Sequence, residues 1–328
     1  MEGIFTVSLD FELHWGVFDK KNRDARRNCY ENTLRLVPEM LELFSKHGVH
    51  VTWATVGSLF ADDEKEWYQL KPANEPVYEN PAYSAYHYVK LNGLDQKVRW
   101  AHFAPELVAK ILEYPGQELG THTFSHYYCL ERLRGEDAFE ADLKAVQRAA
   151  AKFNTEMRSL VFPRNQFNPQ HLKACYKHGI RTIRSNPSVW FWSPVADGGG
   201  SLLRKIFRTG DAYLPMSSNR TSFPLASLKA VKNEPLQVPA SRFLRPWHPR
   251  YKAANNLVLN RVMSEMKKAA INKECYHLWW HPENFGDYPE QNMENLRQIL
   301  NHYTECKRKY GMKSWNMDEY AIHFELSL

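Results

Sequence analysis

Residues 4–12, Ile4-Phe5-Thr6-Val7-Ser8-Leu9-Asp10-Phe11-Glu12, predict a buried β-strand that ends on two carboxylates. The run from residue 4 to residue 9 is rich in β-forming side chains and alternates loosely, as strands do. Asp10 and Glu12 stand where the strand finishes. In α/β barrels, catalytic side chains gather at the C-terminal ends of the strands. This stretch therefore indicates both the start of a sheet and one edge of an active site.

The next two elements indicate that the sheet is parallel. Residues 32–47 place apolar side chains at helical spacing, and Gly48, a residue that commonly ends helices, follows them. Residues 49–56 then form a second apolar run, which ends at Gly57. The order strand, helix, strand is the repeating unit of a parallel sheet.

The remaining chain continues this alternation with two long interruptions. We expect helices at 104–112, 136–153, 169–178, 255–271 and 293–310, and strands at 118–120, 159–162, 180–184, 236–239 and 275–280. Segment 61–105 is rich in aromatic residues that we expect to pack on the sheet, with one or two facing a ligand. Segment 185–235 contains Asp197-Gly198-Gly199-Gly200, which predicts a flexible turn. We therefore expect one catalytic domain over residues 1–328, with insertions at about 61–105 and 185–235.

Composition limits the classes of partner. The chain has 328 residues, 43% of them hydrophobic, and a formal net charge of +6. This modest positive excess favours a small anionic partner or surface over a nucleic acid polymer. The arginines that stand close together in the sequence are Arg23, Arg26 and Arg27, then Arg204 and Arg208, then Arg242, Arg245 and Arg250. Each cluster is either an anion site or part of a solvated surface.

Cysteine usage and hydropathy predict a cytoplasmic protein. The five cysteines are scattered and form no CxxC pair, which indicates thiols in a reducing compartment. The chain begins with no charged n-region or apolar h-region. No apolar run approaches the ~20 residues of a membrane-spanning helix.

Two histidines follow the predicted strand 118–120, in Gly120-Thr121-His122-Thr123-Phe124-Ser125-His126. Four residues make about one helical turn, so His122 and His126 could face one divalent metal ion. A catalytic zinc usually takes three protein ligands, and Asp10 or Glu12 could supply the third. The alternative is two surface or hydrogen-bonded histidines with no metal.

Two more predicted strands end on polar side chains. Arg164 and Asn165 follow strand 159–162, and His281 follows strand 275–280. Since the C-terminal ends of parallel strands converge on one face of a barrel, we expect all these side chains in one site.

The order of these motifs resembles the polysaccharide deacetylase family, the carbohydrate esterases with NodB homology. The resemblance is carried by Ser8-Leu9-Asp10-Phe11-Glu12, Thr52-Trp53-Ala54-Thr55-Val56-Gly57, Thr121-His122-Thr123-Phe124-Ser125-His126, Phe162-Pro163-Arg164-Asn165-Gln166 and Leu278-Trp279-Trp280-His281-Pro282. The resemblance spans roughly residues 4 to 285. The resemblance implies an α/β fold, a distorted or incomplete (β/α) barrel with long insertions, and metal-dependent removal of an acetyl group from a sugar.

Carried over by position, the resemblance implies a metal site made by Glu12, His122 and His126. The expected metal is a divalent ion, Zn²⁺ above others. Asp10 would be the general base. The chain has Asp-x-Glu where the family usually has two adjacent aspartates, so the roles of Asp10 and Glu12 could be exchanged.

The same resemblance implies a general acid and a residue that orients the base. His281 would protonate the leaving amine, and Arg164 would orient the base. Trp15, Asn165 and Trp280 are the candidates for substrate binding. Trp15, Trp279 and Trp280 could wall an acetyl-sized pocket, although tryptophans on or near strands are more often part of the core.

The function that follows is an N-deacetylase of a nucleotide-linked, lipid-linked or oligomeric N-acetylated sugar. The resemblance is greatest to members that serve lipopolysaccharide, O-antigen or capsule assembly inside the cell. The arginines between 204 and 250 would then bind a diphosphate. The alternatives are a hydrolase of a non-sugar C–N bond, similar to allantoinases and imidases, and a carbohydrate-binding barrel that has lost the reaction.

Overall fold

The computed structural model describes residues 2–133, 138–187, 196 and 221–325. Every ladder between two strands in these ranges is parallel. The strands are β1 (Ile4–Phe11), β2 (Val51–Thr55), β3 (Gln117–Thr121), β4 (Ser159–Val161), β5 (Thr182–Ser185), β6 (Leu236–Pro239), β7 (Arg242–Phe243), β8 (Cys275–Trp280) and β9 (Lys313–Ser314).

The strands form one curled sheet in the order β6-β5-β4-β3-β2-β1-β8-β7, with β9 beside β1. The two ends of this order, β6 and β7, are consecutive in the chain. The Ala240 N–H donates to Ser185 O, just at the end of β5, at 2.9 Å, and the Ser241 N–H donates to His277 O on β8 at 2.8 Å. We call residues 239–242 the seam, because here one run of chain passes from one edge of the sheet to the other. The fold is therefore α/β, with a distorted and incomplete (β/α) barrel, as the sequence predicts.

Side chains of β1 alternate between two environments, as the pleat of a strand requires. Phe5, Val7 and Leu9 belong to the large apolar core that the helices share with the sheet. Thr6, Ser8 and Asp10 point to the opposite face and bond with side chains from other elements. This polar inner face of the first strand leads directly to the site described below.

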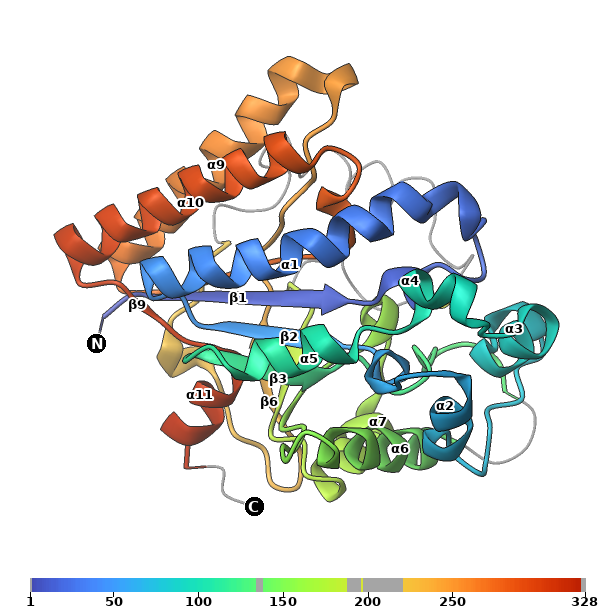
Figure 1. Ribbon diagram of the computed structural model, residues 1–328. Coiled ribbons are helices and arrows are strands. Elements are labelled where there is room, and N and C mark those ends of the chain that lie inside the picture. Colours follow the sequence, from blue (N-terminus) through green and yellow to red (C-terminus); the bar gives the residue numbers. More distant parts are fainter. Residues whose placement is uncertain (1, 134–137, 188–195, 197–220, 326–328) are drawn as a thin grey trace.

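Helices cover the outside of the sheet (Figure 1). α1, α9 and α10 lie together on one side of β1, and α6 and α7 lie on the opposite side of the molecule. The helices are α1 (Arg27–His47), α2 (Glu64–Leu70), α3 (Ala85–Asn92), α4 (Arg99–His102), α5 (Pro105–Leu112), α6 (Phe139–Ala151), α7 (Pro169–Lys177), α9 (Lys252–Asn272), α10 (Pro289–Tyr310) and α11 (Met317–His323).

Local chemistry sets several helix ends. α1 ends at Gly48, whose φ of 63° lies in the left-handed region that glycine adopts without strain. α7 begins after Asn168, whose side chain accepts the N–H of His171 while the His171 side chain bonds back to the Asn168 N–H. This is a reciprocal cap of the kind that satisfies the first amides of a helix.

The last helix closes the N-terminal end of the barrel. In Figure 1, α11 lies toward the tail of β1, away from its arrowhead. The Met317 N–H donates to Thr52 Oγ1 at 2.7 Å, and Tyr320 Oη shares a 2.7 Å hydrogen bond with Thr6 Oγ1. The inner face of the sheet is thus closed at one end by α11 and open at the other.

The predicted elements occur within a few residues of their predicted bounds, and the described residues contain six further α-helices and strands, three of them in segment 61–105. β7 and β9 have two residues each, which is too short for a hydrophobic period to be recognised, and α11 lies in a region that the sequence left unassigned. Segment 61–105 contains α2, α3 and α4, and Trp67, Tyr78 and Tyr86 in it are buried as expected. The turn at Asp197–Gly200, Arg204 and Arg208 lie outside the described residues.

Two further sequence predictions concern thiols and membranes. All five cysteines are buried, and none forms a disulfide. None of the helices in the described part of the chain combines the length and hydrophobicity that a membrane span requires.

Candidate metal-binding active site

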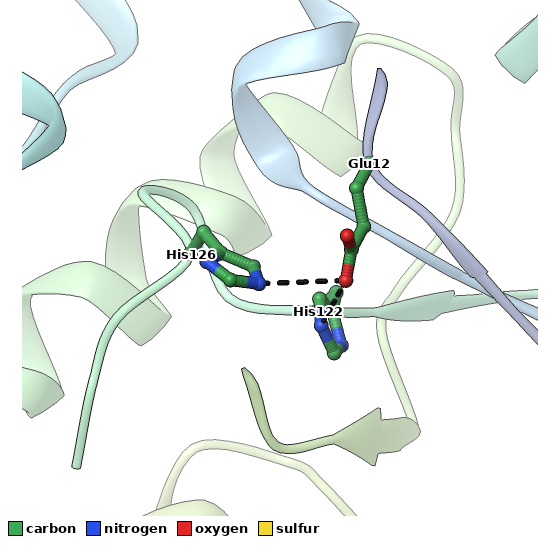
Figure 2. Close-up of side chains that lie close together, drawn as sticks. All are labelled: Glu12, His122 and His126. Atoms are coloured by element: carbon green, nitrogen blue, oxygen red, sulfur yellow. Dashed lines mark ion pairs between the residues drawn. The ribbon is translucent and has the colours of Figure 1, made fainter. Parts of the chain in front are cut away.

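The carboxylate of Glu12 lies between two imidazoles at the open end of the barrel (Figure 2). Its Oε1 is 2.9 Å from His122 Nε2 and 3.4 Å from His126 Nε2. Glu12 follows β1, and the two histidines follow β3, two strands away in the sheet. The sequence placed these three residues in one site, and the structure brings them together.

The turn that carries the histidines is not helical, which corrects the geometry expected from their spacing. His122 directly follows β3, and its N–H donates to Thr55 O at 2.9 Å. Thr123 has a φ of 64° and His126 a φ of 55°, so the chain bends back through left-handed conformations. The two imidazole centroids are 5.1 Å apart. We call residues 122–127 the β3 turn.

A buried carboxylate from α6 fixes the β3 turn. Asp142 Oδ1 accepts the Phe124 N–H at 2.6 Å, and its Oδ2 accepts the Ser125 N–H at 3.1 Å and the Ser125 hydroxyl at 2.5 Å. Burial raises the pKa of Asp142 to about 6. Asp142 was missed from the sequence, although an acid on the apolar face of a predicted helix was a signal for it.

A second buried carboxylate fixes the turn after β1, residues 12–16, which we call the β1 turn. Glu283 Oε1 accepts the N–H groups of Glu12 at 2.9 Å and Leu13 at 2.5 Å. Leu13 has a φ of 48°, a left-handed conformation that costs energy for a branched residue. Burial, with Glu12 nearby, raises the pKa of Glu283 to about 8. Glu283 was also missed, because its partners are backbone groups far away in sequence.

The chemistry of the three converging groups fits a divalent metal ion. Suitable ligand atoms of Glu12, His122 and His126 lie within 4.8 Å of one another, and all three residues are buried. The Nδ1 atoms of His122 and His126 are buried and have no hydrogen-bond partner among the described residues. Burial would raise the pKa of Glu12, but His281, His126 and His122 outweigh burial and keep the pKa well below its usual range. An ionised carboxylate with two imidazoles is a common donor set for catalytic zinc.

Asp10 lies beside this group but is bound to an arginine. Arg184 Nη1 donates to Asp10 Oδ1 at 2.6 Å, and Nη2 donates to Oδ2 at 2.7 Å. Such a paired contact fixes both the position and the plane of a carboxylate. The sequence had assigned this orienting role to Arg164. The Arg164 guanidinium instead pairs with Asp19 and stacks on Tyr128, with its Cζ 3.8 Å from the ring centroid.

The reason for this correction lies in the strand register. Val161 of β4 pairs with Arg184 of β5, so Arg184 points to the inner face at a level near Asp10. Arg164 comes later, in a turn after β4, where its φ of 54° directs the chain toward the rim. Arg184 is a charged residue at the end of the predicted strand 180–184, and this was a signal that its side chain could point to the inner face of the sheet.

His281 completes the site from β8. Its Nε2 lies 3.6 Å from Glu12 Oε1 and 3.8 Å from Asp10 Oδ2. The side chain is 28% exposed, unlike the buried ligand group, and Asn284 Nδ2 lies 3.4 Å from its Nδ1. His281 therefore stands between the two carboxylates and the open cavity.

The cavity above these residues has a volume of about 450 Å³. Asn165 lines it as expected, but Trp15 and Trp280 do not: both are completely buried, Trp15 against Trp67 and Trp280 against Phe285. The tryptophan that lines the cavity is Trp279. Neighbours on a strand point to opposite faces, so only one of two adjacent tryptophans can reach the site. The described residues that line it are Asp10, Glu12, Leu13, Gly16, Val17, Lys21, Arg26, Tyr30, His126, Arg164, Asn165, Trp279, His281, Glu283 and Asn284.

Comparisons with known proteins agree with the motifs and the fold. A sequence model of the family described as polysaccharide deacetylase matches residues 28–183, which confirms the resemblance and includes both histidines of the β3 turn. The acids of β1 and the late His281 lie outside the matched range. No curated protein sequence matches the chain significantly.

Solved structures of low sequence identity share the fold. A Mycobacterium smegmatis protein described as a polysaccharide deacetylase has 13% identity and a TM-score of 0.58, with 99% of this chain and 92% of that chain covered. PuuE allantoinase has 8% identity and a TM-score of 0.57, with coverage of 99% and 90%. A GH57-type branching enzyme from Pyrococcus horikoshii has 14% identity and a TM-score of 0.51, with coverage of 99% and 71%. The names of these proteins cover several reactions, so the fold alone does not identify the reaction.

Proposed function

We propose that the protein is a metal-dependent hydrolase that removes the acetyl group from an N-acetylated sugar. The family match supports a deacetylase. The observation that carries the finer proposal is the meeting of Glu12, His122 and His126 in one buried group, beside Asp10 and His281. We take the whole chain as one catalytic domain.

Glu12, His122 and His126 would hold the metal, for which Zn²⁺ suits two imidazoles and one carboxylate. A bound divalent ion supplies Lewis acidity toward the acetyl carbonyl and lowers the pKa of water. The contacts also support a division of labour between the two acids: Glu12 faces both imidazoles, whereas Asp10 is paired with Arg184.

Asp10 is the proposed general base. Its carboxylate is held in a fixed plane by Arg184, next to the ligand group, where it can accept a proton from the attacking water.

His281 is the proposed general acid. The amine that leaves in amide hydrolysis must gain a proton, and an imidazole can carry one at neutral pH. Nε2 of His281 lies on the cavity side of both carboxylates. Phe243 and Trp279 pack against the ring, at centroid distances of 6.0 and 5.8 Å, and limit its orientation.

Three basic side chains of the cavity support a sugar that carries negative charge. Lys21, Arg26 and Arg164 line it together with the acids Asp10, Glu12 and Glu283; Arg26 is also paired with Asp287, and Arg164 with Asp19. A volume of about 450 Å³ can take a small saccharide, and Trp279 offers a ring face for stacking. We therefore propose a substrate linked to a diphosphate, as in nucleotide-linked or lipid-linked sugars. The corresponding pathway would be surface polysaccharide biosynthesis, and the protein would act in the cytoplasm.

A second candidate function is hydrolysis of a non-sugar C–N bond. The structural similarity to PuuE allantoinase over nearly all of both chains favours it. The same donor set and the same acid and base would serve that reaction.

The test is acetate release from UDP-N-acetylhexosamines, measured beside hydrolysis of allantoin and cyclic imides. Purified protein would be assayed as isolated, after chelation, and after addition of Zn²⁺. We expect acetate release that is lost on chelation and restored by Zn²⁺. Hydrolysis of the heterocycles alone would support the second candidate. Sugar binding without any hydrolysis in the metal-loaded protein would contradict both and leave a carbohydrate-binding barrel.

A further inference from the structure

Arg184 is held in a symmetrical set of contacts in the interior of the barrel. The residue is 1% exposed. Besides its two bonds to Asp10, Nη1 donates to Ser8 Oγ at 3.1 Å and Nη2 donates to Asn165 Oδ1 at 3.2 Å. Its Cζ lies 4.1 Å from the ring centroid of Trp279. Each terminal nitrogen thus contacts one oxygen of Asp10 and one oxygen of a flanking side chain.

The contact through Ser8 continues into a chain of hydrogen bonds whose directions are fixed. His277 Nδ1 lies 3.2 Å from Pro239 O, a carbonyl that can only accept, so Nδ1 carries the proton. In a neutral imidazole the other nitrogen, Nε2, is then an acceptor, and it lies 2.8 Å from Ser8 Oγ. Burial, with Arg184 nearby, lowers the pKa of His277 to about 3, which agrees with a neutral ring. Ser8 must therefore donate to His277 and accept from Arg184.

Ser8 and His277 join the proposed base to the seam of the barrel. The main chain of His277 bonds to the seam twice: its N–H donates to Ser241 Oγ at 2.9 Å, and its O accepts the Ser241 N–H at 2.8 Å. The line of contacts runs from Pro239 through His277, Ser8 and Arg184 to Asp10.

We propose that Ser8 and His277 are positioning residues that set the geometry of Asp10 through Arg184. This inference rests on the proposed function, in which Asp10 is the base. Arg184 Nε has no hydrogen-bond partner among the described residues, so the guanidinium is oriented only at its two terminal nitrogens and on its flat face. Removal of the Ser8 hydroxyl takes away one of the two hydrogen bonds of Arg184 Nη1. The Asp10 carboxylate then turns with the guanidinium, and proton transfer is slowed while the metal group and cavity stay in place.

The chain offers a matched control on the same strand. Thr6 also lies on the inner face of β1, is fully buried, and shares one hydrogen bond, with Tyr320 Oη at 2.7 Å. Thr6→Val and Ser8→Ala each remove one buried hydroxyl from β1, but of these two hydroxyls only that of Ser8 contacts Arg184. We expect Ser8→Ala to lower kcat by about tenfold or more, the usual range for a residue that orients a reacting group. We expect KM and metal content within about twofold of the wild type, because no substrate or metal contact is lost.

Conservative variants separate positioning from packing. His277→Gln retains one acceptor and one donor in a neutral side chain, so we expect it to keep more kcat than His277→Leu at a similar melting temperature. Ser8→Cys keeps the volume with a weaker hydrogen bond, and it replaces Ser8→Ala should that variant not fold. The assay uses the UDP-N-acetylhexosamine that releases acetate fastest.

A second readout does not depend on activity. In protein labelled with ¹⁵N-arginine, slow rotation of a fixed guanidinium gives separate Nη signals, assigned to Arg184 by their absence in Arg184→Lys. We expect separate signals in the wild type and Thr6→Val, and averaged signals in Ser8→Ala or Ser8→Cys. Equal kcat in Ser8→Ala and Thr6→Val, or Arg184 signals that Ser8→Ala leaves unchanged, would overturn the inference. A wild-type protein that releases no acetate would contradict the proposed function. The Arg184 signals would then still show whether Ser8 orients the Arg184 guanidinium.

Discussion

The β1 turn and the β3 turn supply the three candidate ligands, and they are built alike. Each contains a non-glycine residue with positive φ, Leu13 in one and Thr123 in the other. In each, a buried carboxylate from a distant element accepts two consecutive backbone N–H groups, Glu283 in one and Asp142 in the other. An acidic side chain thus substitutes for the backbone partners that a turn at the end of a sheet lacks.

The two turns differ in what else the carboxylate does. Asp142 uses both oxygens on the β3 turn, and it comes from a helix that carries no other site residue. Glu283 uses one oxygen, and it lies two residues after His281. The two candidate histidine ligands are therefore fixed by the scaffold alone, whereas Glu12 is fixed by the same segment that carries the proposed acid. We infer that the β3 turn would set the position of a bound metal and that the β1 turn would couple this position to the proposed acid.

The largest expected effect comes from removing a ligand from either turn. Glu12→Ala and His126→Ala should each abolish stoichiometric metal binding and lower acetate release by about a thousandfold or more, since the lost Lewis acid is worth several kcal/mol. Metal content is measured by mass spectrometry of the purified protein. His47→Ala, whose imidazole bonds Thr304 at the surface, is the control and should match the wild type. Retention of metal by Glu12→Ala alone would remove the β1 turn from the ligand set.

The next effect separates the two carboxylates. Asp142→Asn keeps one acceptor but turns an amide N–H toward the Ser125 N–H, so a buried donor is left unpaired at a cost of about 1–3 kcal/mol. Glu283→Gln keeps the single oxygen that accepts from Glu12 and Leu13, and should cost less than about 1 kcal/mol. Urea unfolding at pH 6 measures both. Equal losses would mean that the two turns are fixed in the same way.

Two glycines, Gly16 and Gly57, test how closely the two turns are packed. A Cβ on Gly16 would lie 1.6 Å from Glu12 Oε2, a movable side-chain atom, whereas a Cβ on Gly57 would lie 2.9 Å from the Cα of Phe124, in the backbone of the β3 turn. Gly16→Ala should lower Zn²⁺ affinity about ten- to a hundredfold with little change in melting temperature, because it displaces only a ligand. Gly57→Ala should cost about 1–3 kcal/mol of stability through overpacking. Calorimetric titration and thermal unfolding separate the two outcomes; the reverse pattern would contradict this view of the turns.

The smallest effect is a difference in pH dependence between the carboxylates. An acid with a raised folded-state pKa holds its proton more tightly in the folded chain, so its contribution is present below the unfolded pKa and lost as the pH rises to the folded pKa. For Asp142 this window runs from 3.8 to about 6, and for Glu283 from 4.5 to about 8.

Of these two carboxylates, only Glu283 should destabilise the metal-free protein as the pH rises from 6 to 8. Glu283→Gln should reduce the loss of stability over this range by about 2 kcal/mol, and Asp142→Asn should leave it unchanged. Urea unfolding of the metal-free proteins at pH 6, 7 and 8 provides the measurement. Parallel curves for the wild type and Glu283→Gln would show that Glu283 does not titrate in this range.

Periodicity predicted most of the fold from the sequence, because long strands and helices carry their hydrophobic pattern locally. The motif order also identified Glu12, His122 and His126, which the structure brings into one group. The pairing of residues between neighbouring strands could not be predicted from the sequence. Arg184 is chosen over Arg164 by the register of β4 and β5. No local pattern states that register.

The tryptophans of β8 and the carboxylates of Asp142 and Glu283 also depend on three-dimensional relations that the sequence does not state. Trp279 and Trp280 are adjacent, and only the phase of β8 decides which one lines the cavity. Asp142 and Glu283 act on backbone amides, which are chemically the same at every position of a sequence. Their partners become visible only when the turns are seen in three dimensions.

The position of β1 between β2 and β8 has a consequence for the order of synthesis. Ile4 pairs with Cys275, so β1 receives β8 as a neighbour only after about 270 further residues have been made. At about 5–20 residues per second this interval is roughly 15–50 s. During it, one edge of β1 has no partner from its own chain, and unpaired edges invite association with other chains. Nascent chains of this protein should therefore depend on holdase chaperones until β8 emerges, and ribosome-bound chains that stop before residue 275 should be the most prone to aggregate.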